Sequence, residues 1–277
     1  MPADHLERGE ELEVELLLEG IHRRYGFDFR EYAPASLKRR LRRRMDGEEV
    51  ETISALQNLI LHDPAVMERL LLDLSVNVTA MFRDPSFYLA FREQVVPVLR
   101  TYPFSRLWVA GCSTGEEVYS LAILLAEEGL SDRVRIYATD INQAVIDVAR
   151  LGVFPLDKMQ EYTQNYIRAG GSRSFSEYYV ARYDGARFAG RLMDGVVFAQ
   201  HNLASDSTFN EFHAITCRNV MIYFAQPLQE HVHSLFYESL AVFGVLALGQ
   251  KESIRFSPHE AAFEELESDE KLYRKIR

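Results

Sequence analysis

Residues 106–120, RLWVAGCSTGEEVYS, decide the fold of this chain. The apolar run 107–110 predicts a buried strand, Gly111 and Gly115 bracket a turn of small residues, and apolar residues recur at helical spacing from Val118 onward. A strand, a glycine-containing loop and a helix in this order are typical of a nucleotide-type site at the carboxyl end of a central strand. The stretch contains neither G-x-G-x-x-G nor a phosphate-binding Gly-Lys-Ser/Thr.

The first turn of this helix carries two glutamates, Glu116 and Glu117. A helix N-terminus usually attracts anions, but two carboxylates there would repel a pyrophosphate. A ligand with an adenosine part, a positive charge and no phosphate fits better, and S-adenosylmethionine is such a ligand. The alternative is a plain strand–turn–helix connection whose acidic first turn complements the helix dipole. These residues alone leave both interpretations open.

Composition indicates a soluble globular protein of the cytoplasm. The chain of 277 residues is long enough for two domains, and no apolar run approaches the roughly 20 residues that span a bilayer. The N-terminus is acidic and has no signal-peptide pattern. The only cysteines, Cys112 and Cys217, each end an apolar run, so they are expected to be buried and to bind no metal. The net charge of −10 disfavours general binding of nucleic acid.

Residues 1–75 are expected to form an all-helical domain. Apolar spacing predicts helices at 12–21, 53–62 and 65–74, and Ser36 is expected to cap a further helix. That helix concentrates positive charge within an acidic chain. Its cations are Lys38, Arg39, Arg40, Arg42, Arg43 and Arg44. They form either a solvated face or a docking surface for an acidic partner, which would relieve their mutual repulsion.

Residues 76–104 are expected to be a linker and cofactor-capping segment, with a helix from Pro85 through Val96. From residue 105 to 277 strands and helices alternate, which indicates a mostly parallel, doubly wound sheet of the α/β class. Further strands and helices are expected after the glycine loop. They are strands at 134–138, 196–199, 214–217 and 245–249, an edge strand at 271–276, and helices at 143–151 and 226–243.

A small antiparallel β subdomain is expected around residues 172–194. Strands 179–183 and 186–189 flank Asp184-Gly185, a pair that favours a type I′ hairpin turn.

Polar residues follow four of the expected parallel strands. They are Gly111, Asp140, Asn202 and the pair Arg218-Asn219. Ligands of open α/β sheets bind outside the carboxyl ends of the strands, and a carboxylate after the second strand is placed to hold a ribose. The sequence therefore predicts a nucleotide-type site at this edge. For the segment 139–142, the alternative is that Thr139 or Asn142 only caps the next helix.

These motifs together resemble the chemotaxis receptor methyltransferases of the CheR family. The segments that carry the resemblance are NVTAMFR (77–83), GCSTGEEVYSLA (111–122), ATDI (138–141), HNL (201–203), CRNVMIYF (217–224), SLKRRLRRRM (36–45) and GQKES (249–253). The resemblance implies a helical N-terminal domain, a methyltransferase domain and a small β subdomain. It further implies transfer of methyl from S-adenosylmethionine to glutamate side chains on the cytoplasmic helical bundle of bacterial chemoreceptors, which serves chemosensory adaptation and leaves S-adenosylhomocysteine.

The resemblance also assigns roles to residues. Arg83 and Tyr223 are expected to act on the substrate carboxylate, with Arg83 also near the methyl donor. The expected cofactor residues are Asn77, Thr79, Arg83, Gly111, Glu117, Asp140, Asn202, Leu203, Arg218 and Asn219. For Arg218 and Asn219 the alternative is a structural ion pair and a helix cap, and for Leu203 it is core packing. The basic helix 38–44 is expected to dock the receptor, and the protein is expected to act as a monomer without metal, nucleic acid or membrane insertion.

Two other functions stay open from the residues alone. One is a methyltransferase acting on another protein, a small molecule or nucleic acid, although the basic helix has few of the aromatic residues that stack on bases. The other is a non-catalytic module that only binds the cofactor, against which the presence of Arg83, Asp140 and Tyr223 argues.

Overall fold

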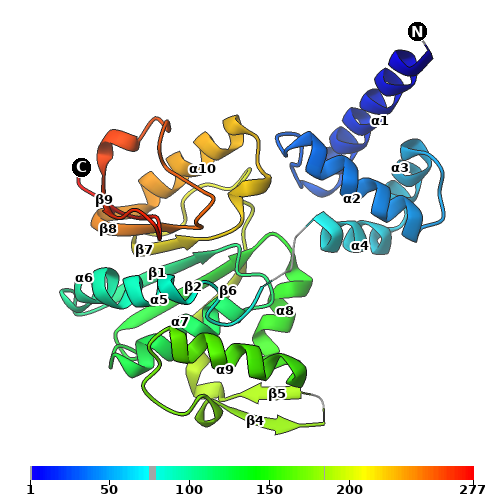
Figure 1. Cartoon of the computed structure of the whole chain (residues 1–277). Coiled ribbons are helices and arrows are strands. Elements are labelled where there is room, and N and C mark those ends of the chain that lie inside the picture. The colour runs from blue at the N-terminus through cyan, green and yellow to red at the C-terminus, as the bar shows by residue number, and fades with distance from the viewer. Residues whose placement is uncertain (1, 75–78, 184) are drawn as a thin grey trace. The chain divides into compact units, whose positions relative to one another are not determined.

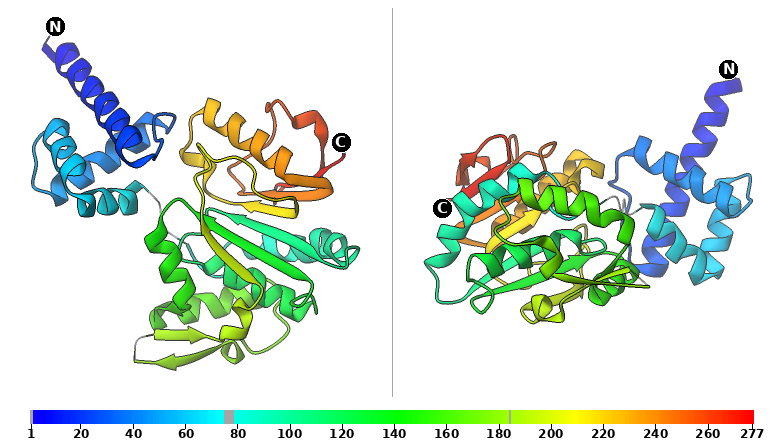
Figure 2. Two further views of the ribbon diagram at one scale, coloured as in Figure 1. Left: turned by 180° about the vertical axis from the view of Figure 1, so that it is seen from behind. Right: turned by 60° about the horizontal axis from the view of Figure 1, so that its bottom comes forward.

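The computed structural model describes residues 2–74, 79–183 and 185–277, with side chains from residue 9 onward. The chain forms two compact units, each considered by itself (Figures 1 and 2). The first contains residues 2–74 together with 204–206 and 223–231. The second contains residues 79–203, 207–222 and 232–277.

The first unit begins with helices in sequence. They are α1 (Pro2–Tyr25), α2 (Pro34–Gly47), α3 (Ile53–His62) and α4 (Pro64–Leu74). Leu17, Ile21, Leu56 and Ile60 are fully buried between them. The predicted helix 53–62 is confirmed, and Thr52 caps it by accepting a hydrogen bond from the backbone of Ala55 at 3.1 Å. The first helix is longer at both ends than the apolar spacing indicated.

The expected start of the basic helix at Ser36 was wrong. Ala33 is the N-cap of α2 and Pro34 is its first residue, so Ser36 lies within the first turn. Proline is favoured at the first helical position because its φ is already helical and its missing N–H would have no partner there.

The second unit is built on a mostly parallel sheet in the order β6-β2-β1-β7-β8-β10-β9. Its strands are β1 (Ser105–Ala110), β2 (Val134–Asp140), β6 (Val196–Gln200), β7 (Phe212–Cys217), β8 (Leu240–Leu248), β9 (Phe263–Glu267) and β10 (Leu272–Lys275). β1 pairs in parallel with both β2 and β7, so the strand order reverses beside it. This is the topological switch point at which doubly wound sheets bind ligands.

Helices cover both faces of the sheet. They are α5 (Pro85–Ala90), the π-helix η1 (Phe91–Val95), α6 (Val96–Arg100), α7 (Glu116–Glu127), α8 (Gln143–Leu151), α9 (Met159–Arg168) and α10 (Gln226–Ser239). α7 and α10 lie on opposite sides of the sheet (Figure 1). Trp108 of β1 contacts Phe236 of α10 on one side, with ring centroids 5.4 Å apart. The predicted helix 143–151 is confirmed, whereas the single helix expected over 85–96 is three consecutive segments that reach Arg100.

A second, antiparallel sheet has the order β3-β5-β4, and its strands are β3 (Val153–Phe154), β4 (Tyr179–Arg182) and β5 (Gly185–Phe188). The predicted β subdomain is therefore present. Arg182 pairs with Gly185, so Gly185 belongs to β5 rather than to the expected turn 184–185. Asp184 lies outside the described residues, and the predicted turn type is not tested. Short 3₁₀ segments complete the described chain at η2 (Leu156–Lys158), η3 (Phe175–Glu177), η4 (Gly190–Met193), η5 (Met221–Tyr223) and η6 (Glu260–Ala262).

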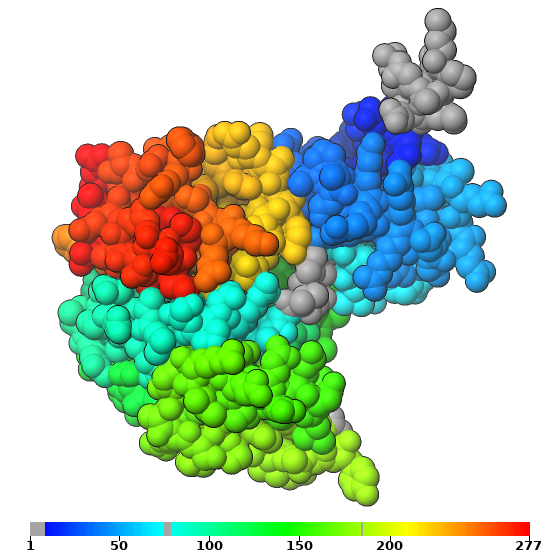
Figure 3. Space-filling model, in the orientation of Figure 1, coloured from blue at the N-terminus to red at the C-terminus, as the bar shows by residue number. Residues whose placement is uncertain are grey.

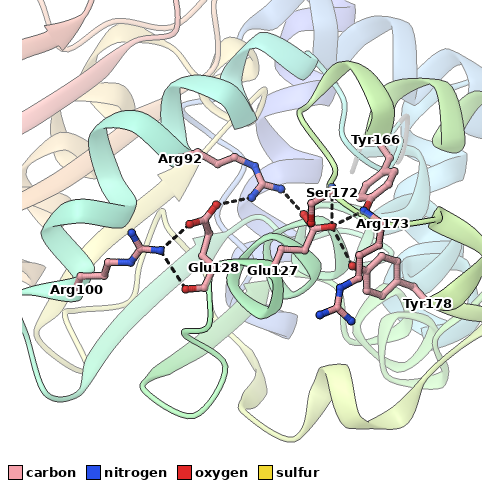
Figure 4. Close-up of polar contacts among 8 residues, drawn as sticks. All are labelled: Arg92, Arg100, Glu127, Glu128, Tyr166, Ser172, Arg173 and Tyr178. Carbon is pink, nitrogen blue, oxygen red and sulfur yellow. Dashed lines mark hydrogen bonds and ion pairs between the residues drawn. The ribbon is translucent and has the colours of Figure 1, made fainter.

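Glu127, at the C-terminal end of α7, fastens the segment that carries this small sheet (Figure 4). Its carboxylate accepts hydrogen bonds from the hydroxyls of Tyr166 at 2.5 Å and Tyr178 at 3.0 Å, and from the backbone of Ser172 at 3.1 Å. Arg92 of the π-helix forms an ion pair with it at 2.5 Å. In the space-filling view, α9 and the small sheet form the green to yellow-green lower part of the second unit (Figure 3).

Two expectations for the C-terminal part were wrong. α10 ends at Ser239 rather than 243, because residues from Leu240 onward belong to β8. The last strand, β10, is not an edge strand, since it lies between β8 and β9. The edge strand β9 was not predicted, and neither were α9 and β3.

Candidate active site

The glycine loop after β1 is held against the end of β2. The backbone N–H groups of Gly111 and Cys112 both donate to the carbonyl of Thr139 at 2.8 Å. Gly111 has φ +77°, and a Cβ atom there would lie 2.5 Å from Cγ2 of Val220. Only glycine fits this close approach, which brings the end of β1 against the turn that follows β7.

Asp140 is buried at the end of β2 and faces the glycine loop. Its Oδ2 accepts the backbone N–H of Ser113 at 2.9 Å, and its Oδ1 accepts that of Asn142 at 3.0 Å. Burial raises the pKa of this carboxyl above its ordinary value, although these backbone donors act in the opposite direction. Two carboxylate oxygens offer about four acceptor positions, so capacity is left for the hydroxyls of a ribose.

Asn142 also performs the capping role that the sequence left open. Its side-chain oxygen accepts the backbone N–H of Ala144 at 2.9 Å and so caps α8. Its Nδ2 is buried, and no described residue accepts a hydrogen bond from it. Thr139 instead accepts a hydrogen bond from the Trp108 indole at 2.8 Å.

The end of β6 joins the same edge. The backbone N–H of His201 donates to the carbonyl of Asp140 at 3.0 Å, and the next two residues, Asn202 and Leu203, are buried. Gly111, Asp140 and Asn202 thus follow or end neighbouring parallel strands at one edge of the sheet. Thr79 is half-buried, and the predicted cofactor residue Asn77 lies outside the described residues.

The two glutamates of the glycine loop point in different directions. Glu116 is turned inward, where it accepts from Thr114 Oγ1 at 2.7 Å and from the Tyr162 hydroxyl at 3.4 Å. Burial raises the pKa of Glu116. Glu117 instead accepts from Thr216 at 2.7 Å and pairs with Arg218 at 3.0 Å. Only one of the two carboxylates therefore faces the strand ends.

Arg218 joins the glycine-loop helix to the capping segment. Its guanidinium pairs with Glu117 at 3.0 Å and with Asp84 at 2.9 Å, and its side chain is 2% exposed. The guanidinium carbon also lies 3.8 Å from the centre of the Phe87 ring. The structural ion pair that stood as the alternative for Arg218 is therefore present, and it lies within the predicted site. Burial acts to lower the pKa of Arg218, but Glu117, Tyr88 and Asp84 together outweigh it and the pKa is raised.

Arg83 is carried on a strained turn. The residues on either side of it, Phe82 and Asp84, have φ angles of +51° and +56°, which side chains other than glycine rarely adopt. Phe82 is fully buried, its backbone N–H donates to Ser120 Oγ at 2.8 Å, and the Arg83 carbonyl accepts from Arg218 at 3.4 Å. Strain of this kind persists where surrounding contacts enforce it and is frequent at functional sites. Arg83 itself is half-buried.

Tyr223 belongs by its contacts to the first unit, whereas Arg83 belongs to the second. Its carbonyl accepts the backbone N–H of Ala33 at 2.9 Å, and the Arg40 guanidinium lies 4.4 Å from the centre of its ring. Arg40 is buried, burial lowers its pKa, and it donates to the carbonyl of Leu74.

The six cations of α2 consequently differ in accessibility. Arg40 is buried, Arg44 pairs with Asp73 and with Glu48 at 3.0 Å, and Lys38 pairs with Glu11 at 3.6 Å. The remaining three are exposed. They are Arg39, Arg42, which contacts Glu10 at 3.2 Å, and Arg43, which contacts Asp73 at 3.4 Å.

The sequence analysis did not predict Asp84 and Glu252 as residues that support the candidate active site. Glu252 is buried and accepts backbone hydrogen bonds from Asn219 and its neighbours. The only signal in the sequence was its position in the segment 249–253, which supported the family resemblance.

Neither cysteine offers a reactive thiol or a ligand. Cys112 and Cys217 are free and buried, and burial raises the pKa of both thiols well above the usual range. In the described parts of the chain, no group of three or more His, Cys, Asp or Glu side chains is arranged around a metal position. No described helix combines the length and apolarity needed to cross a membrane.

The fold and the site define a class. A glycine loop at the switch point, a buried carboxylate after β2 and an acidic rather than phosphate-binding helix start are features of a Rossmann-type enzyme that uses an adenosine cofactor without a pyrophosphate. The spare acceptor capacity of Asp140 and the unsatisfied Nδ2 of Asn142 fit the polar groups of adenosine. The class is the S-adenosylmethionine-dependent methyltransferases.

Comparison with known proteins gives the family. Residues 77–272 match the family described as CheR methyltransferase, SAM binding domain, and residues 12–75 match its all-alpha domain. A Pseudomonas putida protein named "Putative methyltransferase Cher3" is 49% identical over 97% of this chain and 98% of its own length. The chemotaxis protein methyltransferase 2 of Pseudomonas aeruginosa is 32% identical over 80% of this chain and 78% of its own.

Among solved structures, the N-methyltransferase NodS of Bradyrhizobium japonicum is 15% identical, with a TM-score of 0.38 over 71% of this chain and 97% of its own. The chain belongs to the CheR family and is an S-adenosylmethionine-dependent chemotaxis methyltransferase.

Proposed function

We propose that this protein methylates glutamate side chains on the cytoplasmic helical bundle of bacterial chemoreceptors, and that it does so in the cytoplasm as a monomer. The observation that carries the proposal is the mounting of Arg83. Phe82 and Asp84, on either side of Arg83, have left-handed backbone conformations. Arg218 holds this turn through the Arg83 carbonyl and Asp84, and it also pairs with Glu117 of α7, the helix that follows the glycine loop. A rigidly carried cation at the cofactor edge suits the positioning of a carboxylate.

S-adenosylmethionine supplies a methyl group on a positively charged sulfur, which a carboxylate oxygen can attack directly. A glutamate with an ordinary pKa of about 4.3 is already ionised at pH 7, so the protein needs no general base. What its residues provide is orientation, which can contribute up to about 7–11 kcal/mol in ideal cases.

In this proposal the residues at the strand ends bind the cofactor, and the residues of the capping segment orient the substrate. Asp140 holds the ribose hydroxyls, while Asn202, Leu203 and Asn219 line the cofactor. Glu117 and Arg218 fix the capping segment against the glycine loop, to which they are joined by the ion pairs described above. Arg83 aligns the substrate carboxylate, and Tyr223 assists it.

The same proposal assigns docking of the receptor to the exposed cations of α2. Arg42 and Arg43 lie three and four positions after Arg39, so the three side chains share one face of the helix. The side chains of Arg42 and Arg43 are 67% and 79% exposed, and an ion pair of a surface side chain such as that of Arg42 contributes little. The partner of Arg43, Asp73, is buried but is also paired with Arg44, so it keeps a cation when Arg43 turns away. Both arginines are therefore free to exchange partners for the glutamates of a receptor bundle.

The decisive experiment incubates the protein with methyl-labelled S-adenosylmethionine and the cytoplasmic fragment of a chemoreceptor. We expect label on the receptor that is released as methanol by base, because methyl esters hydrolyse in base and methylated amines do not. A fragment whose candidate glutamates are replaced by glutamine is the control and should stay unlabelled. Absence of transfer, or label that resists base, would refute glutamate methylation.

A further inference from the structure

Glu252 has no cationic partner among the described residues, yet it is a buried carboxylate only 6% exposed. Its hydrogen-bond donors among the described residues are backbone N–H groups, and burial raises its pKa although these donors act in the opposite direction. Oε2 accepts from Gly249 at 2.7 Å and from Asn219 at 2.9 Å. Oε1 accepts from Val220 at 2.9 Å, Met221 at 2.7 Å and Ile222 at 3.3 Å. An ionised carboxylate suits this set because it only accepts hydrogen bonds.

Four of these five donors come from the turn 219–222, which contains the predicted site residue Asn219. Asn219 has φ +61°, and Val220 packs against Gly111 so closely that a Cβ atom there would approach to 2.5 Å. Arg218 precedes the turn and Tyr223 follows it in the chain. The carboxylate thus fixes a strained turn that lies between the end of β7 and the glycine loop of β1.

Gly249 shows how tightly the carboxylate fits. A Cβ atom on Gly249 would lie 2.7 Å from Oε2 of Glu252 and 2.8 Å from the backbone nitrogen of Asn219. Any larger residue at 249 would push the carboxylate off the turn. The ends of β1, β7 and β8 are therefore coupled through one side chain.

We propose that Glu252 is a positioning residue for methyl transfer, which sets the conformation of the turn 219–222 and through it the placement of Asn219. This inference rests on the proposed function for the role of Asn219. A residue that only stabilised the fold would change the free energy of unfolding without a selective effect on turnover, whereas a positioning residue changes turnover of protein that is still folded.

The test uses Glu252→Gln in the full-length chain. The glutamine amide would place N–H donors against backbone N–H donors, so we expect the amides of 219–222 to exchange hydrogen at least tenfold faster while those of β1 do not change. Affinity for S-adenosylhomocysteine, measured by calorimetry, should fall at least tenfold. At saturating cofactor, kcat for receptor methylation should fall at least tenfold with KM for the receptor within threefold.

Two further variants test the same geometry. Glu252→Asp keeps the charge and should restore part of kcat and of the amide protection. Gly249→Ala keeps Glu252 itself and should reproduce the glutamine effects in weaker form, which preserves the test if Glu252→Gln does not fold.

The matched control is Glu127→Gln. Glu127 is another carboxylate with a buried side chain, held by Tyr166, Tyr178, Ser172 and Arg92 at the opposite end of α7 from the glycine loop. It should lose stability but keep kcat within twofold. Protected amides at 219–222 in Glu252→Gln, or a loss of kcat no larger than in the control, would overturn the inference.

Failure of the proposed function would be recognised separately. Wild-type protein would then not methylate the receptor fragment, while amide exchange and affinity for S-adenosylhomocysteine would still decide whether Glu252 sets the turn. Unchanged exchange and affinity in Glu252→Gln would overturn the inference in that case as well.

Discussion

At the scale of single residues, Asp140 combines two tasks. It ties the glycine loop to the start of α8 through Ser113 and Asn142, and its two carboxylate oxygens have acceptor capacity left for further donors. We expect Asp140→Ala to weaken binding of S-adenosylmethionine at least tenfold, about 1.4 kcal/mol, because both ribose acceptors are lost. Calorimetric titration measures this, and urea unfolding verifies that the variant is folded. Unchanged affinity would remove Asp140 from the site.

Arg83 is expected to affect the reaction more than the binding of cofactor. If it aligns the substrate carboxylate, Arg83→Ala should lower kcat at least 100-fold, about 2.7 kcal/mol, with less than a threefold change in cofactor affinity. Arg83→Lys should not restore turnover, because a point charge cannot reproduce the planar guanidinium fork. Steady-state kinetics at saturating cofactor distinguishes these effects. A lysine variant with near-normal kcat would argue against this role.

The sequence could predict residues that follow strands but not those that support them from a distance. Gly111, Asp140 and Asn202 stood at strand ends, and alternating patterns are sufficient to place strand ends at one edge. Glu252 and Asp84 lie at positions that no periodicity marks. Their partners are backbone N–H groups and the buried Arg218, and such pairings exist only in the folded chain.

At the scale of elements, the local sequence pattern predicted some helices and strands correctly, whereas tertiary strand pairing decided others. Residues 143–151 had a capping asparagine and regular apolar spacing, and helix α8 has those bounds. Residues 240–243 continued the apolar spacing of α10, yet they belong to β8. β9 was missed because its sequence FEELE is acidic. Its charges are matched by Arg274 on β10, which pairs with Glu264 at 2.8 Å, and by Arg255, which pairs with Glu265 at 2.9 Å.

The hydrogen bonds and the ion pair of Glu127 should make the stability of the second unit depend on pH in the acid range. Burial acts to raise the pKa of Glu127, but its hydrogen bonds from Tyr166, Arg92, Ser172 and Tyr178 together outweigh it, so the pKa is lowered. A carboxyl whose pKa is lower in the folded state stabilises the fold fully above its unfolded pKa of about 4.3, and that stabilisation is lost as the pH falls toward the folded value. Stability from this group therefore rises with pH through the acid range.

Glu127→Gln should lower the free energy of unfolding by about 3 kcal/mol at pH 7, since it leaves Arg92 with only Glu128 as a carboxylate partner. The difference from wild type should shrink as the pH is lowered below about 4.3. Urea titrations at several pH values between 7 and 3.5 measure it. A difference that stays constant across this range would show that the charge of Glu127 does not contribute.

At the scale of the whole molecule, fold class followed from the sequence but the grouping of segments did not. Alternating strands and helices around one glycine loop predicted the doubly wound sheet. That residues 223–231 pack with the N-terminal helices could not be read from the chain. Phe224 contacts Tyr32, with ring centroids 4.9 Å apart, and the Ala225 N–H donates to the Glu31 carbonyl at 2.8 Å. These contacts join residues nearly two hundred positions apart and have no local signal.

Whole-molecule charge gives the last prediction. With a net charge of −10, the protein as a whole should be repelled by an acidic receptor, and the exposed cations Arg39, Arg42 and Arg43 of α2 offer a local surface on which such a partner can dock. Charges of this kind act mainly on association and its salt dependence. We expect the double variant Arg39→Glu/Arg43→Glu to raise KM for the receptor about tenfold, because two attractive charges become repulsive, with unchanged cofactor affinity.

The control for this variant is Arg106→Glu/Arg135→Glu, two exposed arginines paired across β1 and β2 at the amino ends of the strands. It makes the same change in net charge and should leave KM within twofold. Raising salt from about 0.05 to about 0.3 M shortens the Debye length from roughly 14 to roughly 6 Å and should raise KM of the wild type but hardly that of the α2 variant. If both double variants raise KM equally, total charge governs the encounter and α2 is only a solvated face. If neither does, docking depends on uncharged contacts instead.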